Sequence, residues 1–489
     1  MQKTMNEDLV RSIVQDVLAK IGQSPASGTA SAAAGSCGCG RKSAAQGNLG
    51  VFQDAASAAA AAREAFGELR KQGMAGRRVV VEIVKQICTA KDEEWGKLEF
   101  AETKIGRLEH KIGKLQGIKS IPGVEWLSSL GMSGDHGIAM EENTPFGVVG
   151  AITPVTHSIP TLACNVINIV SAGNTVVFNA HPGGAKCAVT AVQTFNREIE
   201  RALGIANIIT IIETPTIESF NELCASPDVA ILVITGGPGV VKAAMASGKR
   251  AICAGPGNPP VVVDESARLD KAARDIIFGA AFDNNLLCIG EKQIFVLDKV
   301  YGDFLESFKR AGAVQLNNRE LAAVSTEAFS TKDGAGGCSH PVLNRALVGA
   351  DASTLAQIAG RSVPSGTELL FAETDADHLF VIEEQMMPLV PVIRVRDIEE
   401  AVRLAKISEH GYKHSSMIHT LNVEHMTMMA KALDSTLFVK NGSCLAGLGN
   451  GGEGYGSFSI ATTTGEGITT PMTFTRKRRC VMVDNLNQF

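Results

Sequence analysis

Hydrophobic residues near the start of the chain recur at every fourth position. The series consists of Leu9, Ile13, Val17 and Ile21. This spacing predicts an amphipathic helix over residues 1–21 with one apolar stripe. Residues 22–48 are mostly Gly, Ala and Ser, a composition that cannot bury a core and predicts a flexible linker. We therefore expect the helix to dock onto another protein. Folding back onto its own chain or onto a second copy is the alternative.

From residue 49 the apolar spacing remains helical at first and then changes. Residues 55–66 and 79–88 fit helices, whereas after Phe146 short apolar runs end at Gly, Pro or Asn. The expected strands are 147–152, 175–178, 208–212, 229–234, 260–263, 294–297, 369–371 and 391–395, with helix-compatible stretches such as 161–172 and 188–203 between them. Buried strands that alternate with helices predict an α/β fold with a largely parallel sheet.

Composition narrows the class of protein further. The chain has 489 residues, 45% of them hydrophobic, and a formal net charge of −5. This charge disfavours a nucleic-acid-binding protein, and no apolar run approaches the roughly 20 residues of a membrane span. The N-terminus lacks a secretory signal pattern, so we expect a reducing cytoplasm in which the 11 cysteines form no disulfide scaffold. Cys37 and Cys39 lie close together, but a structural zinc site needs four ligands, so we expect no metal site.

One local pattern is typical of phosphate binding. The apolar run 229–234 leads into Thr235, Gly236 and Gly237 and then into a helix-compatible stretch. A glycine turn between a strand and a helix lets backbone amides and the positive helix end approach a phosphate. The strict dinucleotide spacing is not met, and an ordinary structural turn fits this pattern equally well.

A second pattern indicates a nucleophile. Cys288 follows the polar segment 282–285 and precedes an expected strand, a position in which a thiol can be accessible. Such a thiol needs nearby dipoles or cations, and an amide to hold an oxyanion. The alternative is a small core residue. The glycine-dense stretch 441–456 indicates backbone that passes close to a ligand or another chain, or else a surface loop.

Taken together, six ordered motifs resemble the aldehyde dehydrogenase superfamily. They are 153–157, 173–177, 235–237, 255–260, 285–288 and 384–388. The resemblance covers roughly residues 49–484. It is strongest to the CoA-acylating branch, in particular the propionaldehyde dehydrogenases of bacterial microcompartments, because the Phe-Asp-Asn-Asn sequence before Cys288 and the glycine run near 447–454 both match that branch.

The resemblance implies a domain organisation. We expect a modified Rossmann NAD-binding domain over 49–254, with an oligomerisation-arm strand pair near 124–145. A catalytic α/β domain is expected over 255–465 and a C-terminal oligomerisation strand over 466–489. The basic residues 476–479 could attract CoA phosphates, but the alternating pattern of 473–483 favours an edge strand, where charge discourages aggregation.

The resemblance also implies a mechanism. Cys288 would attack an aldehyde, hydride would pass to NAD, and a thioester would remain on the cysteine. The oxyanion would be held by the Cys288 amide and by a side chain of Thr156 or His157. Acylating relatives usually carry Asn where His157 stands, so the donor stays open between these two residues. A neutral His157 satisfied by a local backbone group is the alternative.

The fate of the thioester depends on one position. Hydrolytic relatives activate water with a glutamate, but Ala254 occupies that place here, and alanine cannot abstract a proton. The resemblance therefore implies release of the acyl group by the thiol of CoA. Hydrolysis assisted by another carboxylate, or by none, is the alternative.

Further residues match cofactor positions of the family. The set comprises Thr153, Pro154, Asn179, His181, Pro182, Gly236, Gly237, Gly255 and Glu384, and Glu384 would hold the nicotinamide ribose. Asn179 stands near the place of a lysine that binds the adenosine ribose in hydrolytic relatives. We expect NAD as the cofactor, with NADP left open by the missing lysine.

These observations together predict a CoA-acylating aldehyde dehydrogenase acting on a small aldehyde, with propionaldehyde as the expected substrate. We expect a homo-oligomer, either a dimer or a tetramer. The segment 1–21 resembles peptides that bind microcompartment shell or core proteins, which implies a location inside a cytoplasmic microcompartment. The alternatives are a hydrolytic aldehyde dehydrogenase, an acyl-phosphate reductase on the same scaffold, and a catalytically silent microcompartment-binding protein.

Overall fold

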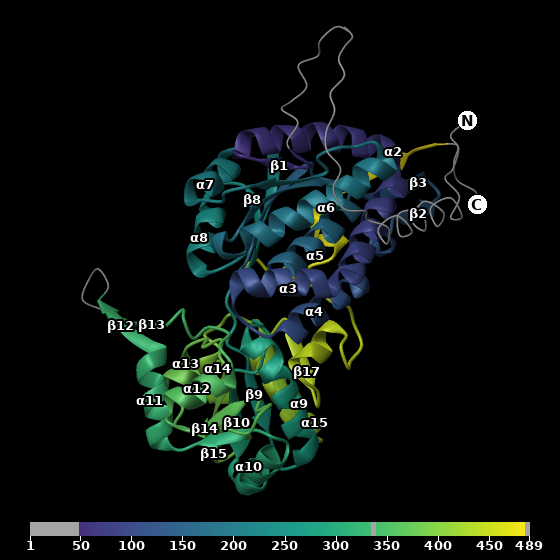
Figure 1. Cartoon of the computed structure of the whole chain (residues 1–489). Helices are drawn as coiled ribbons and strands as arrows, with labels where there is room; N and C mark the ends of the chain where they lie inside the picture. The colour runs from purple at the N-terminus through teal and green to yellow at the C-terminus, as the bar shows by residue number, and fades with distance from the viewer. Residues whose placement is uncertain (1–47, 334–338, 485–489) are drawn as a thin grey trace, which may run out of the picture.

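Two parallel sheets, each covered by helices on both faces, form the two lobes of the molecule (Figure 1). This computed structural model describes residues 48–333 and 339–484. The helix expected in 1–21, the linker up to residue 47, and Cys37 and Cys39 lie outside these residues. The predicted α/β class is confirmed. No helix in the described part of the chain combines the length and hydrophobicity needed to cross a bilayer.

The sheet of the first lobe has the strand order β1-β6-β5-β4-β7-β8, and its neighbouring strands are parallel. The strands are β1 (Val51–Phe52), β4 (Val148–Thr153), β5 (Thr175–Ala180), β6 (Ile209–Ile212), β7 (Val229–Thr235) and β8 (Arg250–Ala254). The expected strands at β4 to β7 are confirmed. Strands β1 and β8 were not expected, because β1 has two residues and β8 begins with a charged one.

Helices enclose both faces of this sheet. They are α2 (Ala55–Ala90), α3 (Asp92–Thr103), α4 (Leu108–Gly117), α5 (Ser158–Ser171), α6 (Ala185–Leu203), α7 (Ile217–Ala225) and α8 (Pro238–Ala246). The core of one face combines α5, α6 and the later part of α2, and the core of the other combines α7, α8 and the first turns of α2. The helical geometry of α2 is broken at Gly73, whose φ of 61° glycine tolerates.

The sheet of the second lobe has the order β11-β14-β15-β10-β9-β16-β17. Its strands are β9 (Pro260–Val263), β10 (Gln293–Leu297), β11 (Val314–Leu316), β14 (Leu370–Glu373), β15 (Leu389–Val395), β16 (Ser415–His419) and β17 (Leu437–Lys440). Its helices are α9 (Leu269–Ala281), α10 (Tyr301–Arg310), α11 (Asn318–Ala328), α12 (Ala352–Ile358), α13 (Leu379–Ile382), α14 (Ile398–Ser408) and α15 (Val423–Leu433). Helices α9 and α10 pack on one face, and α14 and α15 on the other.

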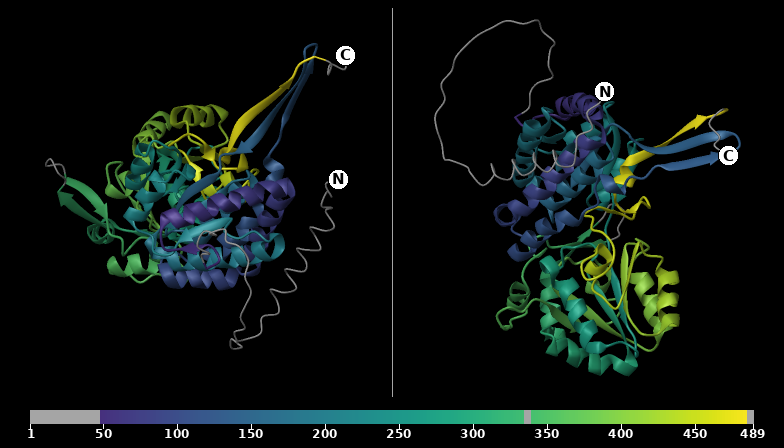
Figure 2. Two further views of the ribbon diagram at one scale, coloured as in Figure 1. Left: turned by 90° about the horizontal axis from the view of Figure 1, so that it is seen from above. Right: turned by 90° about the vertical axis from the view of Figure 1, so that its right-hand side faces the viewer.

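Two hairpins project from the lobes (Figure 2). In the first, β2 (Leu130–Gly134) and β3 (Gly137–Pro145) form a three-stranded sheet with the distant β20 (Thr475–Met482). The basic run therefore lies on an edge strand, where Arg478 and Arg479 pair with Glu142 and Glu141 of β3. This confirms the edge-strand interpretation. The second hairpin, β12 (Phe329–Asp333) with β13 (Ser339–Leu343), was not expected from the sequence.

The chain crosses between the lobes twice. It leaves the first sheet at the end of β8 and enters the second through residues 255–259. It returns through the glycine-dense segment after β17 to β18 (Ile460–Ala461) and β19 (Gly467–Ile468). These crossings bring the carboxyl edge of the first sheet next to the segment that carries Cys288.

Candidate active site

The segment that carries Cys288 begins with an unusual backbone turn. Directly after α9, Asp283, Asn284 and Asn285 have φ values of 51°, 55° and 64°. Non-glycine residues seldom adopt this left-handed conformation, and a run of them persists only where the surroundings determine it strongly. Asp and Asn are the residue types that tolerate it best. The turn lies between α9 and β10. It places Cys288 where the two lobes face each other.

Buried lysines of α4 hold the first residue of this turn. Lys114 Nζ donates to Asp283 Oδ2, and Lys111 Nζ lies 3.5 Å from the same oxygen. Burial would raise the pKa of Asp283, but the two lysines hold it below its ordinary value. Burial lowers the pKa of Lys114 to about 8, although Asp283 opposes this shift. The carboxylate thus carries its charge inside the protein because two cations face it.

The two asparagines of the turn are also fully engaged. Asn284 accepts from Arg107 Nε at 2.9 Å and donates to the Gly349 carbonyl at 2.9 Å. Lys292 Nζ donates to the Asn285 carbonyl at 2.7 Å. Each bond is made by a residue from a different segment of the chain, so the left-handed turn is fixed from several sides.

Cys288 opens into a cavity of about 270 Å³ between the lobes. Its lining is formed by residues 113, 114, 117, 120, 121, 157, 282, 287–289, 445, 448–450, 456–458 and 460. Most of these side chains are apolar, such as Phe282, Leu287 and Phe458. The glycine-dense stretch contributes Leu448 and Gly449, so this stretch does pass close to a candidate ligand site.

The thiol of Cys288 is held in its neutral form. Burial raises its pKa to about 12, and the charge of Glu384 adds to this rise, whereas Lys292 opposes it. The side chain is nevertheless partly exposed. A thiolate is the reactive species of a cysteine, so the free protein keeps this group at low reactivity near neutral pH.

This protonation state predicts a steep pH dependence of alkylation. We expect the rate constant for alkylation of Cys288 by iodoacetamide to rise about tenfold per pH unit between about pH 7 and 9, because the thiolate fraction grows in that proportion below the pKa. Peptide mass spectrometry separates Cys288 from the exposed Cys480. Glu384→Gln should accelerate the reaction at any one pH, because it removes a charge that raises the pKa of Cys288. A rate that levels off above about pH 8 would contradict this account.

The turn after β4 brings His157 to the same cavity. His157 lines it, whereas Thr156 is not among its described lining residues. The His157 Nε2 lies 3.2 Å from Thr156 Oγ1, and Nδ1 lies 3.5 Å from Lys114 Nζ. Burial, followed by the charges of Lys114 and Lys111, lowers the pKa of His157 well below its ordinary value. The imidazole is therefore neutral and carries one N–H donor.

Lys111 and Lys114 also bind the turn that carries His157. The Thr156 carbonyl accepts from Lys111 Nζ at 2.6 Å and from Lys114 Nζ at 3.3 Å. Because Lys114 also binds Asp283, one buried cation connects the turn that carries His157 with the turn that precedes Cys288. The two residues singled out from distant parts of the sequence are thus positioned by a shared network.

Most of the residues expected to bind a dinucleotide lie at the carboxyl edge of the first sheet, whereas Glu384 lies between α13 and β15 of the second lobe. Thr153 ends β4 and precedes Pro154, Asn179 lies in β5 ahead of His181 and Pro182, Gly236 and Gly237 follow β7, and Gly255 follows β8. Strands β4 and β7 are adjacent, and the chain leaves them in opposite directions across the sheet. Ligands of open α/β sheets bind at such a switch point.

Several details at this edge fit a phosphate-bearing ligand. Helix α8 begins directly after Gly237 with Pro238 in its first turn, and no described side chain caps it. A side chain added at Gly237 would meet nothing within 4 Å, so the space over this helix end is open. The buried Thr153 Oγ1 has no hydrogen-bond partner among the described residues. The start of α8 thus offers free amide donors at a positive helix end, and Thr153 adds an unpaired hydroxyl at the end of the adjacent strand β4.

Two of the expected cofactor residues, Asn179 and His181, already form hydrogen bonds within the protein. Asn179 accepts from Ser219 Oγ at 2.8 Å and donates to the Thr216 carbonyl at 3.4 Å, so its amide already supports the start of α7. His181 accepts from Gly183 N at 3.0 Å. For Glu384, burial raises the pKa to about 6, while Lys292 and the Gly257 amide oppose this rise.

Residues 41–456 match the aldehyde dehydrogenase family. The chain belongs to this family. An acetylating acetaldehyde dehydrogenase of Salmonella typhimurium, EutE, is 40% identical to it over 438 residues, which are 89% of this chain and 93% of that protein.

Two solved structures extend the comparison within the aldehyde dehydrogenase family. A propionaldehyde dehydrogenase of Rhodopseudomonas palustris with bound propionyl-CoA is 39% identical and superposes with a TM-score of 0.87 over 91% of this chain and 97% of that one. A propionaldehyde dehydrogenase from the fucose utilisation microcompartment of Clostridium phytofermentans is 40% identical, with a TM-score of 0.85 over 90% and 99% of the two chains.

Two site residues of this aldehyde dehydrogenase were missed by the sequence reasoning. Lys292, near Cys288, contacts Asn285 and faces Glu384. His414 lies so close to Gly257 that an added Cβ there would meet the His414 ring at 2.9 Å and the Cys288 carbonyl at 2.6 Å. Burial, with a smaller effect of Lys292, lowers the pKa of His414 to about 4. No local pattern marks either residue, since each gains its place through contacts between distant segments.

Proposed function

We propose that this aldehyde dehydrogenase oxidises a small aliphatic aldehyde, with propionaldehyde as the expected substrate, to its acyl-CoA. The proposal rests on two features taken together: Cys288 lines a largely apolar cavity, and an alanine, Ala254, stands at the end of β8. Hydrolytic members place the glutamate that activates water at the position of Ala254. A cavity of about 270 Å³ suits a short aldehyde. The relatives described above, an acetylating enzyme and one with bound propionyl-CoA, support this reaction.

In the proposed first step, Cys288 Sγ forms a bond to the carbonyl carbon, and the thiol proton passes to solvent. The developing oxyanion accepts hydrogen bonds from the Cys288 backbone amide and from His157, which reaches the cavity where Thr156 does not. Because the imidazole of His157 is neutral, it stabilises the oxyanion through a hydrogen bond and does not transfer a proton to it. We therefore propose His157, rather than Thr156, as the side-chain donor.

The second step converts the tetrahedral adduct into a thioester on Cys288. A bound NAD would supply the acceptor for the hydride that the tetrahedral carbon loses. We propose that Gly236, Gly237 and the first turn of α8 hold its phosphates, and that Glu384 binds a ribose hydroxyl. The oxygen reforms a carbonyl, and the sulfur keeps the acyl group. Most side chains around the thioester are apolar, which disfavours an ordered water molecule beside it.

The final step transfers the acyl group to CoA. The thiol of CoA loses its proton to solvent as its sulfur attacks the thioester carbon, and Cys288 leaves as a thiolate that regains a proton. Since burial favours the neutral thiol of Cys288, this reprotonation is favourable. The proposal is tested by product analysis: propionaldehyde, NAD and CoA should give propionyl-CoA, detected by chromatography, with little propionate. Propionate as the main product would favour the hydrolytic alternative.

We further propose that the lobes correspond to an NAD-binding domain over 49–254 and a catalytic domain over 255–465. The crossing at 255–259 supports this boundary. The arm formed by β2, β3 and β20 exposes Leu130, Val481 and Met482, and we assign it, including the C-terminal strand within 466–489, to homo-oligomerisation. Exposed apolar side chains on a projecting sheet indicate a partner surface.

Residues 1–21 are proposed to direct the enzyme into a bacterial microcompartment. The apolar stripe of this segment and the microcompartment origin of one relative support the proposal. Deleting residues 1–21 should leave kcat and KM within about twofold and abolish co-purification with shells. Leu9→Glu with Ile13→Glu should act like the deletion, because both changes place charge in the stripe. Co-purification of either variant at the wild-type level would contradict the proposal.

A further inference from the structure

A second cavity, of about 250 Å³, lies in the second lobe and shares no lining residue with the Cys288 cavity. Arg268, Lys271, Ala272, His419, Leu421 and Asn441 line it. These residues end or follow β16, follow β17, or lie at the start of α9, the helix that follows β9. The cavity therefore lies at the carboxyl edge of the second sheet.

This position is the switch point of the second sheet. Strands β9 and β16 are parallel neighbours. From β9 the chain continues through α9 to β10 on one side, and from β16 through α15 to β17 on the other. In the first sheet, the ends of β4 and β7 that carry Thr153 and Gly236 have the same arrangement. Open α/β sheets bind ligands in the crevice that such a reversal creates.

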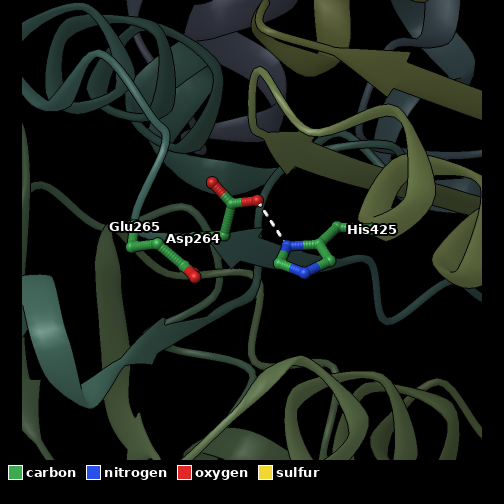
Figure 3. A group of neighbouring side chains, drawn as sticks. All are labelled: Asp264, Glu265 and His425. Atoms are coloured by element: carbon green, nitrogen blue, oxygen red, sulfur yellow. Dashed lines mark hydrogen bonds and ion pairs between the residues drawn. The ribbon is translucent and has the colours of Figure 1, made fainter.

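A buried carboxylate fixes the two loops that border the crevice. Asp264 accepts from Ser266 Oγ at 2.7 Å, from Thr420 Oγ1 and from His425 Nδ1 at 2.8 Å. Figure 3 shows the carboxylate of Asp264 pointing to the imidazole of His425. Ser266 Oγ also accepts from Leu421 N at 2.7 Å. Because its oxygens are occupied by these donors, Asp264 joins the two loops rather than offering free ligands to a metal ion.

Two positively charged side chains, Arg268 and Lys271, border the crevice. Arg268 stands at the cap position of α9, where no described side chain caps the helix. Its exposed guanidinium forms no ion pair with a described residue. Lys271, one turn into the helix, pairs with Asp275 and donates to the Asn441 carbonyl at 2.7 Å. An uncapped helix start beside a free guanidinium attracts anions.

A buried histidine supplies an independent sign of a ligand. His419 lines the cavity and is only 2% exposed, and its Nε2 has no hydrogen-bond partner among the described residues. Burial, followed by the charge of Lys271, lowers the pKa of His419 to about 3, so the ring is neutral. A buried polar atom without a partner is costly, and a ligand oxygen that accepts from Nε2–H would remove that cost.

We propose that this crevice binds the phosphate group of a small phosphate monoester or free phosphate. The guanidinium of Arg268 and the amides at the start of α9 bind the phosphate oxygens, and His419 donates a further hydrogen bond. Arginine matches phosphate through paired N–H donors. The volume exceeds that of a phosphate alone, and the apolar side chains of Ala272 and Leu421 provide a surface for the organic part of an ester.

Calorimetric titration of the full-length enzyme tests the proposal. Saturating NAD is present throughout, so that the turn after β7 is occupied, and ionic strength is held constant. Inorganic phosphate and glycerol 3-phosphate are titrated separately. We expect saturable binding of one stoichiometric equivalent, weakened about tenfold or more by Arg268→Ala. Lys309→Ala, which removes an exposed cation of α10 paired only with Glu306, should leave the affinity unchanged.

The two titrants distinguish the sources of the phosphate group. Tighter binding of glycerol 3-phosphate would support a monoester as the ligand, and equal affinities would support free phosphate. No saturable binding of either titrant to the unaltered enzyme would overturn the proposal. Equal effects of Arg268→Ala and Lys309→Ala would overturn it as well, because the attraction would then be nonspecific.

Discussion

Replacing Cys288 with Ala is expected to reduce CoA-dependent NADH formation by about 10⁴-fold or more, since removing a covalent nucleophile takes away the step on which the others depend. Cys288 is the cysteine that lines the cavity between the lobes. The measurement is the steady-state kcat with propionaldehyde, NAD and CoA. The affinity for NAD, measured by protein fluorescence, should change little, because the proposed phosphate site lies on α8.

The matched control is Cys480→Ala. Cys480 is exposed on the edge strand β20, away from the cavity, so this variant should keep its full rate. A Cys288→Ala enzyme with more than a tenth of the normal kcat would refute the nucleophile. An equal loss in the Cys480 variant would indicate that thiol chemistry elsewhere, such as assembly through the arm, controls the rate.

Asp283→Asn is expected to lower the free energy of unfolding by about 3 kcal/mol near neutral pH, since it leaves Lys111 and Lys114 buried without their counter-charge. Asn keeps the shape of the side chain and tolerates the left-handed backbone, so the charge is the main change. Activity should fall together with stability, because Lys114 connects this residue to the turn of His157. Urea unfolding followed by fluorescence measures the first effect and kcat the second.

The loss of stability should depend on pH in a defined direction. In the native protein Lys114 loses its proton at a pKa of about 8, below its ordinary value, and without Asp283 that pKa falls further. Above this range Lys114 is neutral in both proteins, so the variant should recover part of its stability as pH rises through about 8. Glu142→Gln, which breaks an exposed pair with Arg478, should change stability little. A loss for Asp283→Asn that is small or unchanged between pH 6 and 9 would contradict the network.

Sequence patterns predicted the features that depend on neighbouring residues. The run 229–234, its glycine turn and the following helix appear as β7, the turn at Gly236 and α8, because buried strands and helix starts have local signals. The location of Cys288 between a polar turn and a strand could be predicted from the local sequence in the same way. Family resemblance added what spacing could not, including the meaning of Ala254.

The features that were missed depend on contacts between distant segments. Nothing near Lys114 in the sequence indicates that it binds Asp283, or that His414 lies against Gly257. The hairpin of β12 and β13 was not expected, because two strands of five residues each have too few residues for a clear pattern. Strand β8 was missed because only its later residues are apolar and buried.

The central claim is that the acyl group of the thioester on Cys288 passes to CoA, because Ala254 cannot activate water. The most direct measurement is the number of NADH molecules formed per subunit when CoA is omitted, followed by stopped-flow absorbance. The account predicts a burst of about one NADH per subunit that then stops, and steady turnover once CoA is added. Continuous NADH formation without CoA, at the rate seen with CoA, would contradict the account and show that another group, such as Glu384, activates water for hydrolysis.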